Sequence, residues 1–261
     1  MKNIFVIILI ISLIGFNNPQ YAYAVNTNSA DFTGGATQYL SRTDSSGSWA
    51  ASYTIQFWAQ VTTQPGTGVS FPLFDFTYQS ATPFGALRMW YRDNAGTKEI
   101  YGYRDKTSVG TDVFQFSQTL TTDLWYHISF TWDGADLKTY INGSLANTTA
   151  SSGTGNTNAA NSTKIGGDGT TAFTGRLDDF RHWSVDRGLT QIAIDATCLV
   201  ELVGDEANLV SYYTWNADLT TDDEENHTYT LTNNNSVTQS GTIPSACSSG
   251  GTVRQSEFFD E

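Results

Sequence analysis

The stretch 123-DLWYHISFTWDGADLKTYING-143 predicts two antiparallel strands joined by a tight turn. Every second residue from Tyr126 to Trp132 is apolar or aromatic, and this two-residue period fits a strand, whereas a helix would repeat every 3.6 residues. Asp133 and Gly134 follow at once, and such a pair accepts the positive φ that tight turns require. The predicted hairpin therefore has one face that is more apolar than the other.

On both sides of this hairpin, the chain continues as short strands separated by polar turns. We expect strands near 30–40, 53–61, 71–78, 84–92, 97–103, 114–120, 173–183, 209–215 and 228–231. A short helix near 190–197 is the exception, with Thr190 as its predicted N-cap. Aromatic residues make up 13% of the chain and charged residues 15%, a ratio that favours sheets with aromatic faces over a helical bundle.

The two ends of the chain differ from the middle. Residues 1–24 read as a signal peptide, with Lys2, an apolar run over 4–14 and the small-x-small motif 22-AYA-24. The alternative is an uncleaved membrane anchor. Residues 25–240 form one expected domain, and 241–261 offer little to pack and predict a disordered tail. We therefore expect a secreted protein that is not inserted in the membrane after cleavage.

The net charge of the chain excludes some partners. It is −13 at pH 7, from 26 acidic and 13 basic residues. Such a surface repels nucleic acid and anionic lipid, so neither is an expected partner.

Cys198 and Cys247 are the only cysteines of the chain. In an oxidising compartment they would most simply form a disulfide, and a loop of this size would contribute about 4 kcal/mol by the chain-entropy estimate. A metal site or a catalytic thiol is disfavoured, because neither cysteine belongs to a CxxC motif or has a neighbouring histidine.

Five segments, in this order, carry a family resemblance: 30-ADFTGGATQYLS-41, 52-SYTIQFWAQV-61, 124-LWYHISFTWDGADLKTYINGS-144, 164-KIGGDGTTAFTGRLDDFRHWSVDRGLTQIAI-194 and 202-LVGDEANLVSYYTWNADLTTDDEENHTYTL-231. Together they resemble the laminin-G-like jelly-roll family within the concanavalin A-like lectin/glucanase fold. The resemblance implies an all-β protein, with two antiparallel sheets packed as a jelly-roll sandwich. Its members include lectins, adhesion modules and glycoside hydrolases, so the fold alone does not decide the function.

The hydrolase alternative can be tested on the sequence. Retaining glycosidases need two carboxylates about 5 Å apart, which on a strand means acids at i and i+2. No expected strand has this pair. Asp222 and Glu224, like Asp223 and Glu225, have the spacing but lie in a polar stretch that predicts a solvated loop. We expect no enzyme and no catalytic residue, with a glycoside hydrolase as the second alternative.

The strand predicted over 173–183 is a candidate calcium site. Asp178 shares parity with Phe180, and if that parity faces the core, its carboxylate must be hydrogen-bonded, paired or metal-bound. The resemblance implies calcium here, held by Asp178 with Asp31. Thr33 and Thr37 stand where relatives tend to have acids, so hydrogen bonds from backbone or arginine groups are the alternative for Asp178.

A sugar site would need exposed rings beside polar groups, because sugar C–H faces stack on rings while hydroxyls form hydrogen bonds. In the strand over 84–92, Trp90 shares parity with two arginines and projects from the less apolar face. Aromatic rings in sheets more often serve packing, which is the alternative reading. The candidate ligand-binding residues are Trp49, Arg88, Trp90, Arg92, Tyr101 and Tyr103.

Among five N-x-S/T sequons, those of Asn147 and Asn161 fall in the polar stretch 144–163 and would be accessible for glycosylation in a eukaryote. In a bacterium they carry no such meaning. We predict a secreted, non-enzymatic module that recognises carbohydrate or another cell-surface ligand, assisted by calcium. The alternative is a structural or adhesion module with a protein partner.

Overall fold

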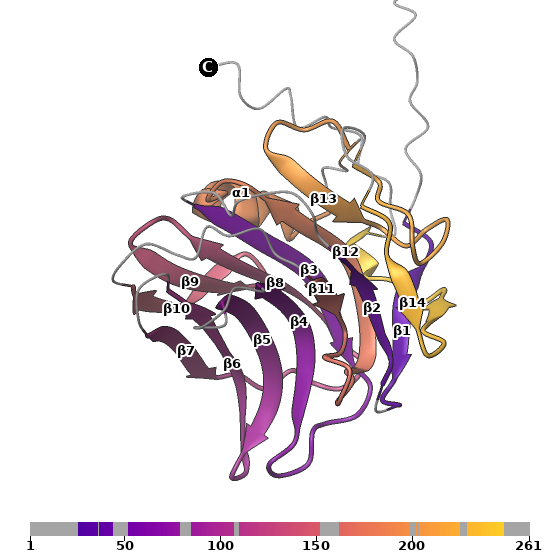
Figure 1. Cartoon of the computed structure of the whole chain (residues 1–261), viewed down its shortest axis with the longest axis horizontal. Helices are drawn as coiled ribbons and strands as arrows, with labels where there is room; N and C mark the ends of the chain where they lie inside the picture. The colour runs from indigo at the N-terminus through magenta and orange to yellow at the C-terminus, as the bar shows by residue number, and fades with distance from the viewer. Residues whose placement is uncertain are drawn as a thin grey trace, which may run out of the picture.

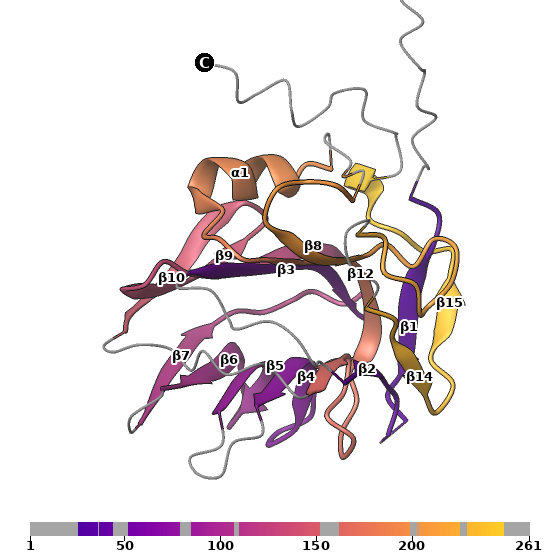
Figure 2. The same ribbon diagram turned by 45° about the horizontal axis from the view of Figure 1, so that its top comes forward.

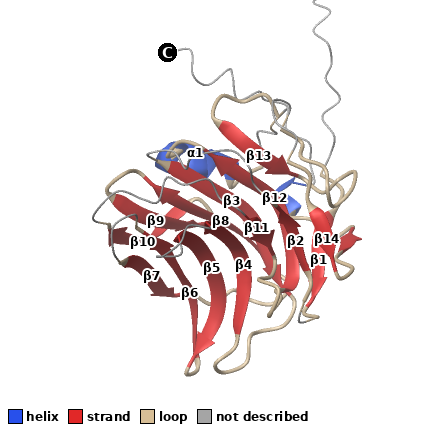
Figure 3. Cartoon of the chain, in the orientation of Figure 1, coloured by secondary structure: helices blue, strands red, loops and turns tan. Residues whose placement is uncertain are grey.

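The protein is a sandwich of two antiparallel sheets, as expected from the sequence (Figure 1). The computed structural model describes residues 26–35, 37–43, 52–78, 85–106, 110–151, 162–198, 202, 204–224 and 229–247. Strands dominate in both layers, and one α-helix lies on the outside of one of them (Figure 3).

Sheet A has the strand order β10-β9-β8-β3-β12-β1-β15, and β13 pairs with the second half of β12. Its strands are β1 (Ser29–Thr33), β3 (Tyr53–Val61), β8 (Trp125–Trp132), β9 (Asp136–Ile141), β10 (Ser144–Ala150), β12 (Thr174–Trp183), β13 (Leu209–Tyr213) and β15 (Thr238–Ser240).

Sheet B has the order β14-β2-β11-β4-β5-β6-β7. Its strands are β2 (Tyr39–Arg42), β4 (Ser70–Tyr78), β5 (Gly85–Asn94), β6 (Thr97–Asp105), β7 (Thr111–Ser117), β11 (Ser162–Ile165) and β14 (Thr232–Asn234).

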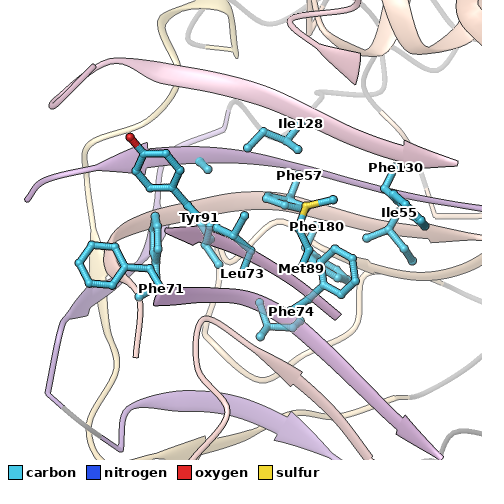
Figure 4. Packing of buried hydrophobic residues seen from close by; sticks show 14 of the residues in the cluster. Ile55, Phe57, Phe71, Leu73, Phe74, Met89, Tyr91, Ile128, Phe130 and Phe180 are labelled. Carbon is cyan, nitrogen blue, oxygen red and sulfur yellow. The ribbon is translucent and has the colours of Figure 1, made fainter. Parts of the chain in front are cut away.

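The core fills the space between the sheets. Phe57 and Ile128 enter it from sheet A, and Phe74 and Met89 enter it from sheet B (Figure 4). The ring of Phe57 stacks on that of Phe180 with centroids 5.8 Å apart and meets Phe74 edge-on at 6.0 Å. Burying an aliphatic or aromatic side chain of this kind contributes about 1.5–3 kcal/mol, so this layer is the main stabilising feature of the fold.

The predicted hairpin is confirmed as β8 and β9. Gly134 has φ 98°, and the carboxylate of Asp133 accepts the backbone N–H groups of Ala135 and Asp136 at 2.8 and 2.7 Å. The predicted apolar face, which includes Ile128, packs into the core.

The single α-helix of the described residues, α1 (Gly188–Asp195), lies on the outer face of sheet A (Figure 2). It begins two residues before Thr190, so the predicted cap is wrong. The carboxylate of Asp186 instead accepts the backbone N–H of Gly188 at 3.1 Å. At the other end of the helix, Asp195 accepts a hydrogen bond of 2.9 Å from Gln56 of β3. Gln56 is fully buried under this contact, and every other residue of β3 is buried as well.

A β-bulge in β12 breaks the parity that we expected around Asp178. Leu177 and Phe180 both belong to the core although they are three residues apart, and Asp179 between them has φ 52°. Asp178 pairs with Trp58 on the outer face of sheet A, so it does not share the core-facing side of Phe180. An extra residue of this kind leaves no periodic signal in the sequence.

The C-terminal segment is packed further than we expected. Ser29 donates a hydrogen bond of 2.8 Å to the carbonyl of Thr242, and the short 3₁₀ helix Ser245–Cys247 follows. Cys198 and Cys247 form the predicted disulfide. Residues 241–247 therefore belong to the folded unit and not to a disordered tail. Residues 1–24 and 248–261 lie outside the described residues. Among the described residues, no helix has the length and apolar character needed to cross a membrane.

Candidate functional site

The candidate site is the outer face of sheet B, the side turned away from sheet A. On β5, Leu87, Met89 and Tyr91 point into the core, so the residues between them point outward. The register of β5 and β6 places Trp90 directly opposite Tyr101. The predicted alternation is thus what brings the candidate side chains together on one face.

Three half-buried rings form the centre of this face. The ring of Trp90 lies 5.7 Å from that of Tyr101 and 5.5 Å from that of Tyr103, at an interplanar angle of 37° in both cases. We call Trp90, Tyr101 and Tyr103 the ring platform. Beside it on β7, Val113 is paired with Tyr103 and is 46% exposed, which extends the apolar surface by one strand.

Arg88 is fixed at one side of the ring platform. Its Nε donates to Asp75 of β4 at 2.8 Å, its Nη1 donates to the hydroxyl of Tyr103 at 3.0 Å, and its Nη2 donates to Thr77 at 3.3 Å. Burial opposes the charge of Arg88, but Asp75 outweighs it and the pKa of the guanidinium is raised. Burial raises the pKa of Tyr103 as well, so this phenol stays neutral.

Arg92 is fixed at the other side. Its Nε donates to Glu99 at 2.5 Å, and its guanidinium carbon lies 3.6 Å from the ring centroid of Tyr101. The other carboxylate oxygen of Glu99 accepts a hydrogen bond of 2.7 Å from Gln115. The guanidinium is therefore positioned by both a carboxylate below it and a ring beside it.

Of the six candidate ligand-binding residues, five are thus adjacent on one face. Trp49 lies outside the described residues.

The two candidate metal residues lie on adjacent strands of sheet A, Asp31 on β1 and Asp178 on β12. Asp31 lies opposite Arg176, with its carboxylate 3.6 Å from the guanidinium Nε. Asp178 is fully buried and accepts a hydrogen bond of 2.8 Å from the Nδ2 of Asn26. Burial, together with the nearby charge of Asp179, raises the pKa of Asp178 well above its ordinary value.

Part of this arrangement still fits a cation. The Oδ1 atoms of Asp178 and Asn26 are both buried without a hydrogen-bond partner, and unpaired buried oxygens are costly unless they bind something. Within the described residues, no three His, Cys, Asp or Glu side chains form a metal-binding group. The unpaired oxygens of Asp178 and Asn26 fit as two ligands, whereas the carboxylate of Asp31 is paired with Arg176.

The sequence predicts that the carboxylates with glycosidase spacing lie in a solvated loop. This prediction is wrong for Asp222 and Glu224, because both are buried. Asp222 accepts the backbone N–H groups of Tyr212 and Glu224 at 2.8 and 3.1 Å, and burial raises its pKa to about 6. The carboxylate of Asp222 is thus engaged by backbone N–H groups. Glu225 lies outside the described residues.

Two histidines are buried in the sheets. Burial lowers the pKa of both His127 and His182 to about 3, so both are neutral at pH 7. His127 packs against Trp58 with ring centroids 5.2 Å apart, which matches the expected structural role. His227 lies outside the described residues.

Of the two predicted glycosylation sites, the structure describes the one at Asn147. Asn147 lies on the edge strand β10, and its Nδ2 donates to Thr149 at 3.1 Å within the same sequon. Asn161 lies outside the described residues.

A family model described as the concanavalin A-like lectin/glucanases superfamily matches residues 33–193, more than half of the chain. The chain belongs to this superfamily. A heptameric SAP-like pentraxin from Limulus polyphemus has a similar structure, with a TM-score of 0.61, 16% identity, and coverage of 87% of this chain and 100% of the pentraxin chain. A comparison with curated proteins found no match.

A second protein of similar structure is a putative carbohydrate binding protein from Bacteroides ovatus ATCC 8483. Its TM-score is 0.58 at 19% identity, and the alignment covers 82% of this chain and 59% of that one. At these identities the two likenesses establish a shared fold.

This superfamily member also has site residues that the sequence did not single out. Glu99 could have been found, because it precedes Tyr101 by two residues and so shares its face. Asp75 and Gln115 could not, since their places depend on how β4 and β7 align with their neighbours. Asn26 was hidden for a similar reason, as it meets Asp178 from 152 residues away.

Proposed function

We propose that the protein is an extracellular, non-enzymatic module that binds carbohydrate on the outer face of sheet B. The observation that carries this proposal is the ring platform, in which the ring centroid of Trp90 lies 5.7 Å from that of Tyr101 and 5.5 Å from that of Tyr103, between two fixed arginines. Sugar rings stack on such surfaces through their C–H faces, and the flanking polar groups accept or donate hydrogen bonds to hydroxyls.

The comparisons support this proposal at the level of the fold. The superfamily contains lectins by its description, and one similar structure is described as a putative carbohydrate binding protein. A disulfide and a laminin-G-type fold also favour an extracellular location.

The carboxylates around the ring platform favour binding over hydrolysis. The side chains of Asp75 and Glu99 are only 5% and 4% exposed, and each is paired with an arginine. A glycosidase needs one carboxylic acid to donate a proton and a second carboxylate to act on the sugar. Neither residue is placed for that task, so we assign both to positioning Arg88 and Arg92.

The test is a glycan array followed by calorimetric titration of the best ligand. We expect Trp90→Ala to weaken its binding at least about tenfold, because the central stacking surface is lost. Leu189→Ala is the matched control, since it removes a 55% exposed side chain from α1 on the other sheet. If no glycan binds, or if Trp90→Ala binds as tightly as the wild type, the proposal is wrong.

We also propose that Asp178 and Asn26 hold calcium when it is present. Calcium would neutralise a buried carboxylate and occupy two oxygens that have no hydrogen-bond partner. Asp31 is replaced in this proposal, because it is paired with Arg176.

A further inference from the structure

The hydrogen-bonding groups left free around the ring platform indicate which sugars it prefers. The Nη1 and Nη2 groups of Arg92, the indole N–H of Trp90 and the hydroxyl of Tyr101 make no hydrogen bond to any described residue. Arg92 and Trp90 can only donate, and the Tyr101 hydroxyl can do both. Gln115 contributes an exposed acceptor beside them, and its amide N–H is engaged by Glu99. The guanidinium of Arg92 and the indole of Trp90 can only donate, so they favour a ligand that is rich in acceptors.

The positive charges on this face are more exposed than the negative charges. The arginine side chains are 30% and 23% exposed, whereas the carboxylates that pair with them, Asp75 and Glu99, are buried beneath. Lys164 of β11 lies next in the same row, opposite Asp75. A ligand approaching the ring platform thus meets cationic groups first, although the chain as a whole carries a net charge of −13.

The two ends of the ring platform differ in the charge that they present to a ligand. Asp105 follows Tyr103 by two residues on β6 and so shares the outer face, and its carboxylate accepts a hydrogen bond of 2.8 Å from Thr111. Glu99 stands at the other end, but its two oxygens are taken by Arg92 and Gln115. An anion is therefore favoured at the Arg92 end and disfavoured near Asp105.

We propose that the site selects acidic saccharides, whose carboxylate or sulfate group binds at Arg92 while the sugar ring stacks on Trp90 and Tyr101. An anionic group has only acceptors to offer and matches a planar guanidinium in two-point contact. The hydroxyls of a neutral sugar can accept from the same donors but carry no charge, so their hydrogen bonds to the guanidinium are weaker. This inference rests on the proposed carbohydrate binding and names its substrate class.

The test uses pairs of oligosaccharides that differ only in charge: oligogalacturonate against its methyl ester, and a sulfated against a desulfated glycosaminoglycan fragment. The first pair tests a carboxylate and the second a sulfate. We expect the acidic member of at least one pair to bind about tenfold more tightly at low salt, and the difference to shrink as salt is added.

The variant that isolates the charge is R92Q/E99Q, which removes one positive and one negative charge and so leaves the net charge unchanged. Glu99 must be changed with Arg92, because a lone carboxylate that is 4% exposed would be left unpaired. K138Q/D133N is the matched control, since it neutralises an ion pair in the β8–β9 turn of sheet A. Thermal unfolding of both variants verifies that they fold.

We expect R92Q/E99Q to lose the preference for the acidic member, so that its affinity for that member falls to its affinity for the neutral one. Equal binding of acidic and neutral members by the wild type would overturn the acidic preference and leave carbohydrate binding intact. A preference that persists in R92Q/E99Q would overturn the role of Arg92. Binding of no saccharide in any pair would overturn both proposals.

Discussion

At the scale of single residues, Asp178 shows how a buried charge can depend on what it binds. Its carboxylate is fully buried, its pKa is raised by burial, and one of its oxygens has no hydrogen-bond partner. Without a cation, such a charge destabilises the fold. In the calcium site that we propose, the same carboxylate would become a ligand.

We therefore expect the effect of Asp178→Asn on the unfolding temperature to depend on whether calcium is present. In chelator at pH 7, the variant should unfold at the same temperature as the wild type or at a higher one. In millimolar calcium, the wild type alone should gain several degrees, because only it binds the ion. Differential scanning calorimetry measures both, and equal calcium shifts in the two proteins would contradict the proposed site.

His127 provides a prediction for pH. Burial lowers its pKa to about 3 in the folded protein, while the unfolded value stays near 6.5. Between these values the unfolded chain binds a proton that the folded protein does not, so falling pH favours unfolding. Relative to His127→Gln, the wild type should lose about 1.4 kcal/mol of unfolding free energy per pH unit below about pH 6. Urea denaturation at pH 7, 6 and 5 tests this difference, and parallel pH profiles would disprove it.

At the scale of elements, α1 is held on sheet A by a buried ionic cluster. Asp195 accepts hydrogen bonds from Gln56 at 2.9 Å and from Arg187 at 3.1 Å, and it lies 3.5 Å from Arg181. Its side chain is completely buried.

Removing this carboxylate should be costly. We expect Asp195→Ala to lower the free energy of unfolding by about 3–5 kcal/mol, because the buried guanidinium of Arg187 loses its carboxylate and that of Arg181 keeps only Asp179. Asp195→Asn should cost less, since it keeps an acceptor of the same size. A loss below about 1 kcal/mol in Asp195→Ala, measured by chemical denaturation, would mean that the helix is held by other contacts.

Strands and turns of the sandwich followed from local sequence, because alternation and turn residues act over a few positions. The β8–β9 hairpin and β3 were predicted in this way, and alternation on β5 placed Trp90 beside Arg88 and Arg92 on one face. The bulge at Asp179 was not predicted, since one extra residue has no period. The contacts of Asp75 and Asn26 were missed because they depend on strand register and on distant chain segments.

At the scale of the whole molecule, the disulfide connects segments 49 residues apart. In the C198S/C247S variant we expect a loss of about 4 kcal/mol, mostly from the greater freedom of the unfolded chain. Chemical denaturation measures this loss. Sugar binding is the internal control, because the cysteines lie outside sheet B. Binding that disappears with the disulfide in a folded variant would show that the two regions are coupled.

The position of the chain ends relative to the outer face of sheet B has a practical consequence. Described residues begin at Asn26 and end at Cys247, and β1 and β15, which pair beside them, belong to sheet A (Figure 2). The ring platform is built from β5 and β6 of the other layer. A fluorescent protein or a biotin tag joined at Asn26 or after Cys247 should leave the outer face of sheet B accessible. A domain immobilised in this way could be used to test glycan capture by the ring platform.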